Sequence, residues 1–120
     1  LSIPMDPMLI EQVLMNLLEN AVKFSEPGST LGIALWKQGD KACISVKNHG
    51  ETIDARELSR VFDRFHKTDH SRSRDRDGVG LGLYIVKSIL NNHDEDIFVT
   101  SRDGVTEFVF TLSLKEKARS

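Results

Sequence analysis

The first quarter of the chain carries apolar residues at helical spacing. Behind Asp6-Pro7, positions three or four apart are apolar: Ile10, Val13, Leu14, Leu17, Ala21 and Phe24. This spacing predicts a helix with one buried stripe that runs to about residue 24. Asp6 is placed to cap the free amide groups of the first turn, where Pro7 has no amide hydrogen to satisfy. The run Ser25-Glu26-Pro27-Gly28 predicts the end of this helix.

Alternation of apolar and other residues predicts strands in the rest of the chain. Four segments show it: Leu31, Ile33 and Leu35; Ala42, Ile44 and Val46; Ile97 and Val99; and Phe108, Phe110 and Leu112. Gln38-Gly39-Asp40 stands between the first two segments, and Asp103-Gly104 stands between the last two. Both runs are typical of hairpin turns, so we expect two antiparallel hairpins.

Two further helices are expected between the hairpins. Asp54 with Glu57 three residues later resembles a capping box, which would open a short helix through Val61. Apolar positions from Leu83 to Leu90 predict a third helix. Because helices and antiparallel hairpins are segregated along the chain, we predict an α+β fold. This fold is a two-layer sandwich, with a mixed, mostly antiparallel sheet of about five strands covered on one face by about three helices.

Length and composition narrow the class of protein. The 120 residues suit a single domain, 1–120, whose charged end, 115–120, we expect to fray. The formal net charge of −2 favours neither nucleic acid nor an anionic membrane as a partner. No apolar run is long enough to span a bilayer. Residues 1–5 do not resemble a natural protein start, so we expect a fragment of a larger protein whose membrane anchor lies elsewhere.

A second, polar stripe follows the apolar one on the first helix. Asn16, Asn20 and Lys23 lie at positions i, i+4 and i+7, so they share one side of the helix. Asparagine is a poor residue for the middle of a helix. A solvated face explains the stripe, and so does a binding site. Asparagine oxygens suit Mg²⁺, and a lysine supplies a point charge for phosphate.

A glycine-rich segment precedes the third helix. Gly78, Gly80 and Gly82 alternate with apolar residues, and such glycines let a backbone approach a ligand closely. The amide groups at the start of the following helix would attract phosphate, although a flexible loop gives the same pattern. A dinucleotide-binding fold needs a strand before the glycines, where this chain has the polar run 71–77. A P-loop needs Gly-Lys followed by Ser or Thr, which is absent.

Three segments together resemble the catalytic, ATP-binding domain of sensor histidine kinases. Residues 16–25, Asn-Leu-Leu-Glu-Asn-Ala-Val-Lys-Phe-Ser, resemble its asparagine box. Residues 61–67, Val-Phe-Asp-Arg-Phe-His-Lys, resemble its phenylalanine box, and residues 78–83, Gly-Val-Gly-Leu-Gly-Leu, resemble its second glycine box. The boxes occur in the family's order, and the resemblance covers residues 6–114. It implies the Bergerat ATP-binding fold, ATP and Mg²⁺ as cofactors, and phosphoryl transfer to a histidine.

The resemblance also implies roles for individual residues. Asn16, Asn20, Lys23 and Lys67 would be catalytic, with Asn20 binding Mg²⁺. The nucleotide would contact Asn16, Asn20, Lys23, Phe24, Asn48, Gly50, Ile53, Phe65, Gly78, Val79, Gly80, Leu81, Gly82 and Leu83. Residues 66–77 would form a lid over ATP. Water-splitting relatives place a glutamate where this chain has Asn16, and an amide cannot act as a general base. The sequence therefore favours transfer to an external nucleophile over hydrolysis.

The chain departs from the family at its first glycine box, residues 46–53. Asn48 replaces the aspartate that accepts a hydrogen bond from adenine, and Thr52 replaces the second glycine. An asparagine oxygen still accepts that bond, but without charge the bond is weaker. This departure leaves open a catalytically weak, nucleotide-binding regulatory module.

The resemblance implies partners outside the chain. We expect a dimerisation domain with the phosphoacceptor histidine, a cognate response regulator and no nucleic acid. The full-length protein is expected to be a membrane-anchored homodimer with this domain in the cytoplasm. None of the chain's histidines lies in a motif like the family's acceptor sites: His49, His66, His70 and His93. An anti-sigma-factor-like serine kinase of the same fold remains an alternative.

Overall fold

A helix with a capped start opens the computed structural model, which describes residues 3–63 and 82–114. Helix α1 spans Pro7–Phe24. A side-chain oxygen of Asp6 accepts a hydrogen bond from the amide of Met8 at 2.9 Å, which confirms the predicted cap. The predicted stripe faces the interior, because Val13, Leu17 and Ala21 are buried.

Four antiparallel strands form one sheet in the described part of the chain. They are β1 (Gly32–Gln38), β2 (Lys41–His49), β3 (Ile97–Arg102) and β4 (Val105–Ser113), in the order β1-β2-β4-β3. The expected hairpins are confirmed. Gly39, Asp103 and Gly104 all have positive φ angles, as tight hairpin turns require. The sheet has one strand fewer than the sequence led us to expect, among the residues that the structure describes.

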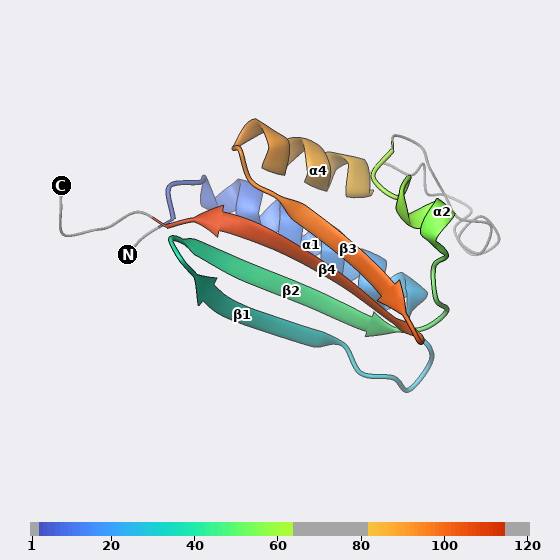
Figure 1. The fold of residues 1–120 in the computed structure, drawn as a ribbon. Coiled ribbons are helices and arrows are strands. Elements are labelled where there is room, and N and C mark those ends of the chain that lie inside the picture. The colour runs from blue at the N-terminus through green and yellow to red at the C-terminus, as the bar shows by residue number, and fades with distance from the viewer. Residues whose placement is uncertain (1–2, 64–81, 115–120) are drawn as a thin grey trace.

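The two long helices lie against one face of this sheet. Helix α4 spans Gly82–Asn92, and it packs against α1 while running in the opposite direction (Figure 1). The short helix α2, Ala55–Leu58, lies at one end of the sheet near β3. Asp54 accepts a hydrogen bond from the amide of Glu57 at 3.0 Å, so the predicted cap is present, but α2 ends three residues before Val61. The predicted two-layer α+β sandwich is confirmed.

The core lies between the helices and the sheet. Its buried members are Met5, just before α1, and residues of α1, α4 and all strands but β1: Val13, Leu17, Ala21, Ala42, Ile44, Val46, Val86, Leu90, Ile97, Phe108, Phe110 and Leu112. Along β2 and β4, every second residue faces this layer. Within residues 3–63 and 82–114, no helix combines the length and apolarity needed to cross a membrane.

Candidate functional site

One end of the sandwich brings together four parts of the chain that are distant in sequence. The last turns of α1, the end of β2, the segment 50–53 and the start of α4 all lie there (Figure 1). The antiparallel course of α1 and α4 produces this, because it sets the C-terminal half of one helix beside the N-terminus of the other. The predicted site residues outside 64–81 all belong to these four parts.

Gly50 joins the end of β2 to the end of α1. A Cβ atom at Gly50 would lie 2.2 Å from the carbonyl oxygen of Phe24, which is far inside van der Waals contact. Just beyond, the amide of Glu26 donates to the carbonyl of His49 at 2.9 Å. Only a glycine therefore allows the two backbones to approach as they do.

The segment 50–53 is held against the turn between β3 and β4. The amide of Gly50 donates to the carbonyl of Gly104 at 2.8 Å, and the amide of Gly104 donates to the Thr52 hydroxyl at 2.7 Å. The amide of Ile53 donates to the Ser101 hydroxyl at 2.8 Å. Thr52 thus uses its side chain to fix the loop.

Asn48 lies beneath this loop on the helix-facing side of β2. It continues the row of Ala42, Ile44 and Val46, and it is 6% exposed. Its cross-strand neighbour on β4 is the buried Thr106, whose hydroxyl lies 2.8 Å from that of Ser101. Polar side chains therefore end the apolar rows of three adjacent strands at this end of the sheet.

Asn16 and Asn20 show the clearest sign of a site. Asn16 Nδ2 and Asn20 Oδ1 are buried atoms without a hydrogen-bond partner among the described residues. A buried polar atom left unpaired costs on the order of 1–3 kcal/mol, so folded proteins rarely keep two of them one helical turn apart. One orphan is a donor and the other an acceptor. This donor set fits an anion together with a hard cation.

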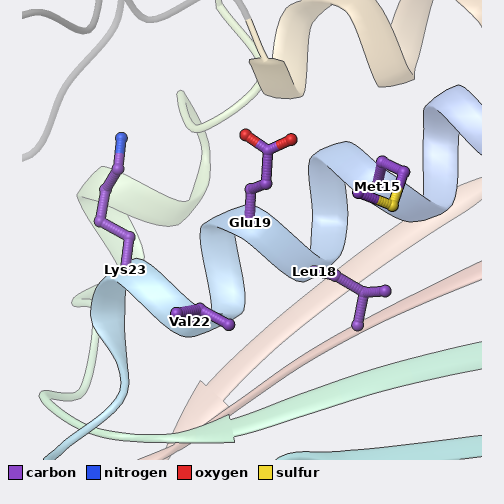
Figure 2. Close-up of a pocket in the computed structure, with 5 residues that line it drawn as sticks. All are labelled: Met15, Leu18, Glu19, Val22 and Lys23. Atoms are coloured by element: carbon purple, nitrogen blue, oxygen red, sulfur yellow. The ribbon is translucent and has the colours of Figure 1, made fainter.

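Lys23 lies beside the two asparagines, about 60° round the helix from Asn20. Figure 2 shows Lys23 and Glu19 extending from the same side of α1. They line a surface hollow of about 460 Å³ with Met15, Leu18 and Val22. Neither asparagine lines this hollow, so it is not the candidate site.

The structure describes only some of the remaining predicted residues, namely those from residue 82 onward. Gly82 is the exposed first residue of α4, and a Cβ atom added to it would meet no described atom within 4 Å; Leu83 is half-buried against the core. Six predicted residues lie outside the described parts: Phe65, Lys67, Gly78, Val79, Gly80 and Leu81. No group of three or more His, Cys, Asp or Glu side chains in the described ranges could hold a metal ion. A cation here would rely on amide and phosphate oxygens.

Sequence reasoning missed the residues that support the loop from β3 and β4. The hydroxyls of Ser101 and Thr106 form a hydrogen bond with each other, and the Ser101 hydroxyl also accepts a hydrogen bond from the amide of Ile53. A signal was present, because Ser101 continues the alternation of Ile97 and Val99 with a polar residue. Nothing in the sequence indicates that Thr52 pairs with Gly104, which lies 52 residues away.

Comparison with known proteins yields a consistent set of relatives. The family model described as histidine kinase-, DNA gyrase B- and HSP90-like ATPase matches residues 5–116. The sensor histidine kinase CusS of Escherichia coli K12 is 39% identical over 107 residues, which cover 89% of this chain and 22% of CusS. WalK of Bacillus subtilis, also a sensor histidine kinase, is 38% identical, over 98% of this chain and 20% of WalK.

Solved structures lead to the same group. The mycobacterial sensor histidine kinase MprB superposes with a TM-score of 0.78 at 27% identity, covering 91% of this chain and 72% of that one. The catalytic domain of the histidine kinase ThkA superposes with a TM-score of 0.77 at 28% identity, covering 90% and 68%. The chain spans about a fifth of the length of the curated relatives.

Proposed function

The chain belongs to the family of histidine kinase-, DNA gyrase B- and HSP90-like ATPases, and from this membership we propose that it binds Mg-ATP and donates the γ-phosphoryl group to a histidine on a separate domain. The observation that carries the proposal is the pair of buried, unpartnered amide atoms on Asn16 and Asn20. They lie on the C-terminal half of α1, at the end of the sandwich where the end of β2, the segment 50–53 and the start of α4 also lie.

The two amides suit different parts of Mg-ATP. Asn20 Oδ1 is a hard oxygen and would hold Mg²⁺, while Asn16 Nδ2 would donate a hydrogen bond to a phosphate oxygen. Lys23 adds positive charge beside them, and Lys67 is assigned to the terminal phosphate by its place in the phenylalanine box. Mg²⁺, when bound, neutralises charge on the phosphates. These residues would position the phosphates and neutralise their charge, which is what phosphoryl transfer chiefly requires.

The nature of Asn16 favours transfer over hydrolysis. Its amide cannot take a proton from water, so no general base stands at this position. The nearest carboxylate on the helix, Glu19, is exposed and lines the surface hollow, which neither asparagine lines (Figure 2). A neutral imidazole is already a nucleophile and needs no such base. The site is therefore suited to a histidine acceptor.

Asn48 and the segment 50–53 are assigned to the adenine. Asn48 is buried next to the loop, and its side-chain oxygen would accept a hydrogen bond from the adenine amino group. Gly50 and Ile53 would line the base, and their hydrogen bonds to Gly104 and Ser101 hold the loop in position for this. Phe24, half-buried at the end of α1, would flank the nucleotide.

The same reasoning extends to partners. CusS and WalK are sensor histidine kinases, and the region that matches this chain covers only 22% of CusS and 20% of WalK. We propose a dimerisation domain carrying the phosphoacceptor histidine and a cognate response regulator as partners, in a membrane-anchored homodimer whose catalytic domain lies in the cytoplasm. The relatives do not favour an anti-sigma-factor-like serine kinase or a purely regulatory module.

Radiolabelled transfer tests this proposal. The full-length gene product, incubated with γ-labelled ATP and Mg²⁺, should acquire an acid-labile, base-stable label. Asn20→Ala should reduce the labelling rate at least about a hundredfold, in line with the loss of a charge-stabilising group. Glu19→Gln, one residue away and exposed, is the matched control and should label like the wild type. Equal labelling of Asn20→Ala and the wild type would refute the assignment, and an acid-stable label would point to a serine kinase.

A further inference from the structure

The segment 50–53 ends in a contact with a side chain of β3. The amide of Ile53 donates a hydrogen bond to the Ser101 hydroxyl at 2.8 Å, and the two residues are 48 positions apart in the sequence. The contact is partly buried, as are both residues. Because water has limited access there, an Ile53 amide without this partner would be left poorly satisfied. The Ser101 hydroxyl therefore holds the end of the segment in place.

Two other contacts between this segment and the β3–β4 turn are of a different kind. The amide of Gly50 donates to the carbonyl of Gly104, which joins two backbones. The Thr52 hydroxyl accepts from the amide of Gly104 in an exposed position, where water can take over a lost bond. Of the three contacts, the one at Ser101 is thus both partly buried and made by a side chain. Its loss should disturb the segment 50–53 most.

The Ser101 hydroxyl is itself fixed by the sheet. Its oxygen lies 2.8 Å from the hydroxyl oxygen of Thr106, the residue directly opposite on β4. Thr106 is 4% exposed, and the branching at its Cβ atom restricts side-chain rotation. Strand β4 is paired on both sides, with β2 and with β3. Ser101 therefore presents its oxygen to Ile53 from a rigid position, and the sheet sets the geometry of the segment.

We propose that Ser101 is a positioning residue for nucleotide binding: through the amide of Ile53, its hydroxyl keeps the segment 50–53 in the conformation that receives the base. This role rests on the proposed function, which assigns Gly50 and Ile53 to the adenine. Ser101 acts through Ile53 and needs no contact of its own with the nucleotide. It sets the fraction of molecules that are ready to bind, and the apparent dissociation constant of a ligand rises as that fraction falls.

A positioning role of this kind separates binding from transfer. Without the Ser101 hydroxyl, the segment leaves its position in a share of the ATP-free molecules, so the apparent affinity for ATP falls. Saturating ATP shifts all molecules to the binding-competent conformation. The α1 residues assigned to Mg²⁺ and the phosphates, Asn16, Asn20 and Lys23, belong to another element and keep their places. The maximum rate of transfer should therefore stay the same.

Autophosphorylation of the full-length gene product, measured over a range of ATP concentrations with Mg²⁺, tests this role. Ser101→Ala should raise the KM for ATP at least about fivefold, the effect of one lost neutral hydrogen bond, and should change kcat by less than about twofold. Ser101→Thr keeps the hydroxyl and should retain the wild-type KM. Thr100→Ala removes a hydroxyl from the exposed neighbouring position of β3, so it is the matched control and should behave like the wild type.

Amide hydrogen exchange of the same proteins measures the intermediate step directly. Without ATP, peptides that contain Ile53 should exchange faster in Ser101→Ala than in the wild type, because local opening becomes easier there. Peptides from the C-terminal half of α1 should exchange equally in both proteins. Saturating Mg-ATP should restore slow exchange around Ile53. Because exchange needs no phosphoryl transfer, it reports on the contact between Ser101 and Ile53 even if the proposed function is wrong.

The contrary results are distinguishable. A wild type that does not use ATP would refute the proposed function and the positioning role with it, while exchange still shows whether Ser101 holds the segment. A wild type that uses ATP, beside a Ser101→Ala variant with unchanged KM, would overturn the positioning role alone. The same holds for a lower kcat at unchanged KM, and for a Ser101→Thr variant as impaired as Ser101→Ala. Equal impairment of Thr100→Ala would assign the effect to β3 as a whole and would also overturn the role of the Ser101 hydroxyl.

Discussion

Asn48 occupies a position whose burial decides what chemistry it offers. At 6% exposure it has little access to water, and an ionised carboxylate there would lose much of its hydration. An amide is cheaper to bury, and it still accepts a hydrogen bond. In the proposed site, the asparagine would form a weaker bond to the ligand but would leave the ligand-free protein more stable. The sequence already indicated that an asparagine would bond a ligand more weakly than an aspartate. The burial of Asn48 explains the benefit, because the ligand-free protein then has no carboxylate to bury at this position.

Asn48→Asp should tighten the binding of ATP. A charge-assisted hydrogen bond is roughly twice as strong as a neutral one, which corresponds to up to about a tenfold lower dissociation constant. Calorimetric titration with ATP measures this. Inosine triphosphate, which lacks the adenine amino group, is the control, and the variant should gain nothing for it. Equal gains for both nucleotides, or weaker ATP binding, would show that Asn48 does not face the adenine amino group.

Residue identities on one helix were easier to predict than contacts between distant segments. Asn16 and Asn20 could be placed on one side of the helix because residues four apart always share a side, whatever the rest of the fold does. The role of Thr52 depends on Gly104, and that of Ser101 depends on Ile53, so both arise only after the sheet has formed. Side chains of a site are predictable from sequence when a single helix or strand carries all of them. They are not predictable when the site forms only after distant segments have come together.

At the scale of elements, the turn between α4 and β3 is fixed by a buried carboxylate. Asp94 adopts a φ of 58°, which aspartate tolerates better than most residues. The next residue, Glu95, is 6% exposed and accepts hydrogen bonds at 2.6–2.8 Å from Lys41, Thr111 and Ser113. These contacts join the turn to the start of β2 and the end of β4. They lie at the opposite end of the sheet from Asn48.

The Glu95 contacts predict an acid-sensitive part of the stability. Burial pushes the pKa of Glu95 up, but the hydrogen bonds from Lys41, Ser113 and Thr111 outweigh it and hold that pKa below the ordinary value of a glutamate. A lowered folded-state pKa stabilises above the unfolded-state pKa, and this stabilisation is lost as pH falls through the folded-state value. Glu95→Gln should lower the free energy of unfolding by about 2 kcal/mol at neutral pH, where hydrogen bonds to charge are strong.

Urea unfolding at neutral pH and below pH 4 measures the difference between this variant and the wild type. The difference should shrink in acid, because the wild type then loses the same charge. Glu11→Gln, an exposed carboxylate on α1, is the control and should change neither value by more than about 0.5 kcal/mol. A difference that stays constant with pH would mean that Glu95 contributes through shape and not through charge.

Element types were predictable, whereas their surroundings were not. Alternation predicts β1 and β2 equally well, yet β2 is buried on both sides and β1 is exposed on both. The alternation reports which residues share a face, and only the placement of α1 over β2 decides which faces are covered. The cap at Asp54 was likewise predictable from the sequence. The end of α2 was not, because the helix stops three residues before Val61.

On the scale of the whole molecule, binding and stability act against each other. The ligand-free protein carries the cost of two buried amide atoms, on Asn16 and Asn20, that have no hydrogen-bond partner among the described residues. Mg-ATP would satisfy both and stabilise the folded state by mass action. Without its ligand, the domain should therefore have a lower free energy of unfolding than it would with an apolar site. Substitutions that replace the unpaired amides with apolar side chains should raise that free energy.

Asn20→Leu is expected to separate the two properties. The apolar side chain of similar size removes a buried acceptor, so the ligand-free chain should gain about 1 kcal/mol in unfolding free energy, seen as a higher melting temperature. The same variant should lose the upward shift that Mg-ATP gives the wild type. Asn91→Leu, at an exposed position of α4, should leave the Mg-ATP shift intact and gain little stability. If Asn20→Leu destabilises the ligand-free chain, the Asn20 amide has a structural partner. If the variant keeps the full Mg-ATP shift, Asn20 does not hold the metal, and the site must be built on other residues.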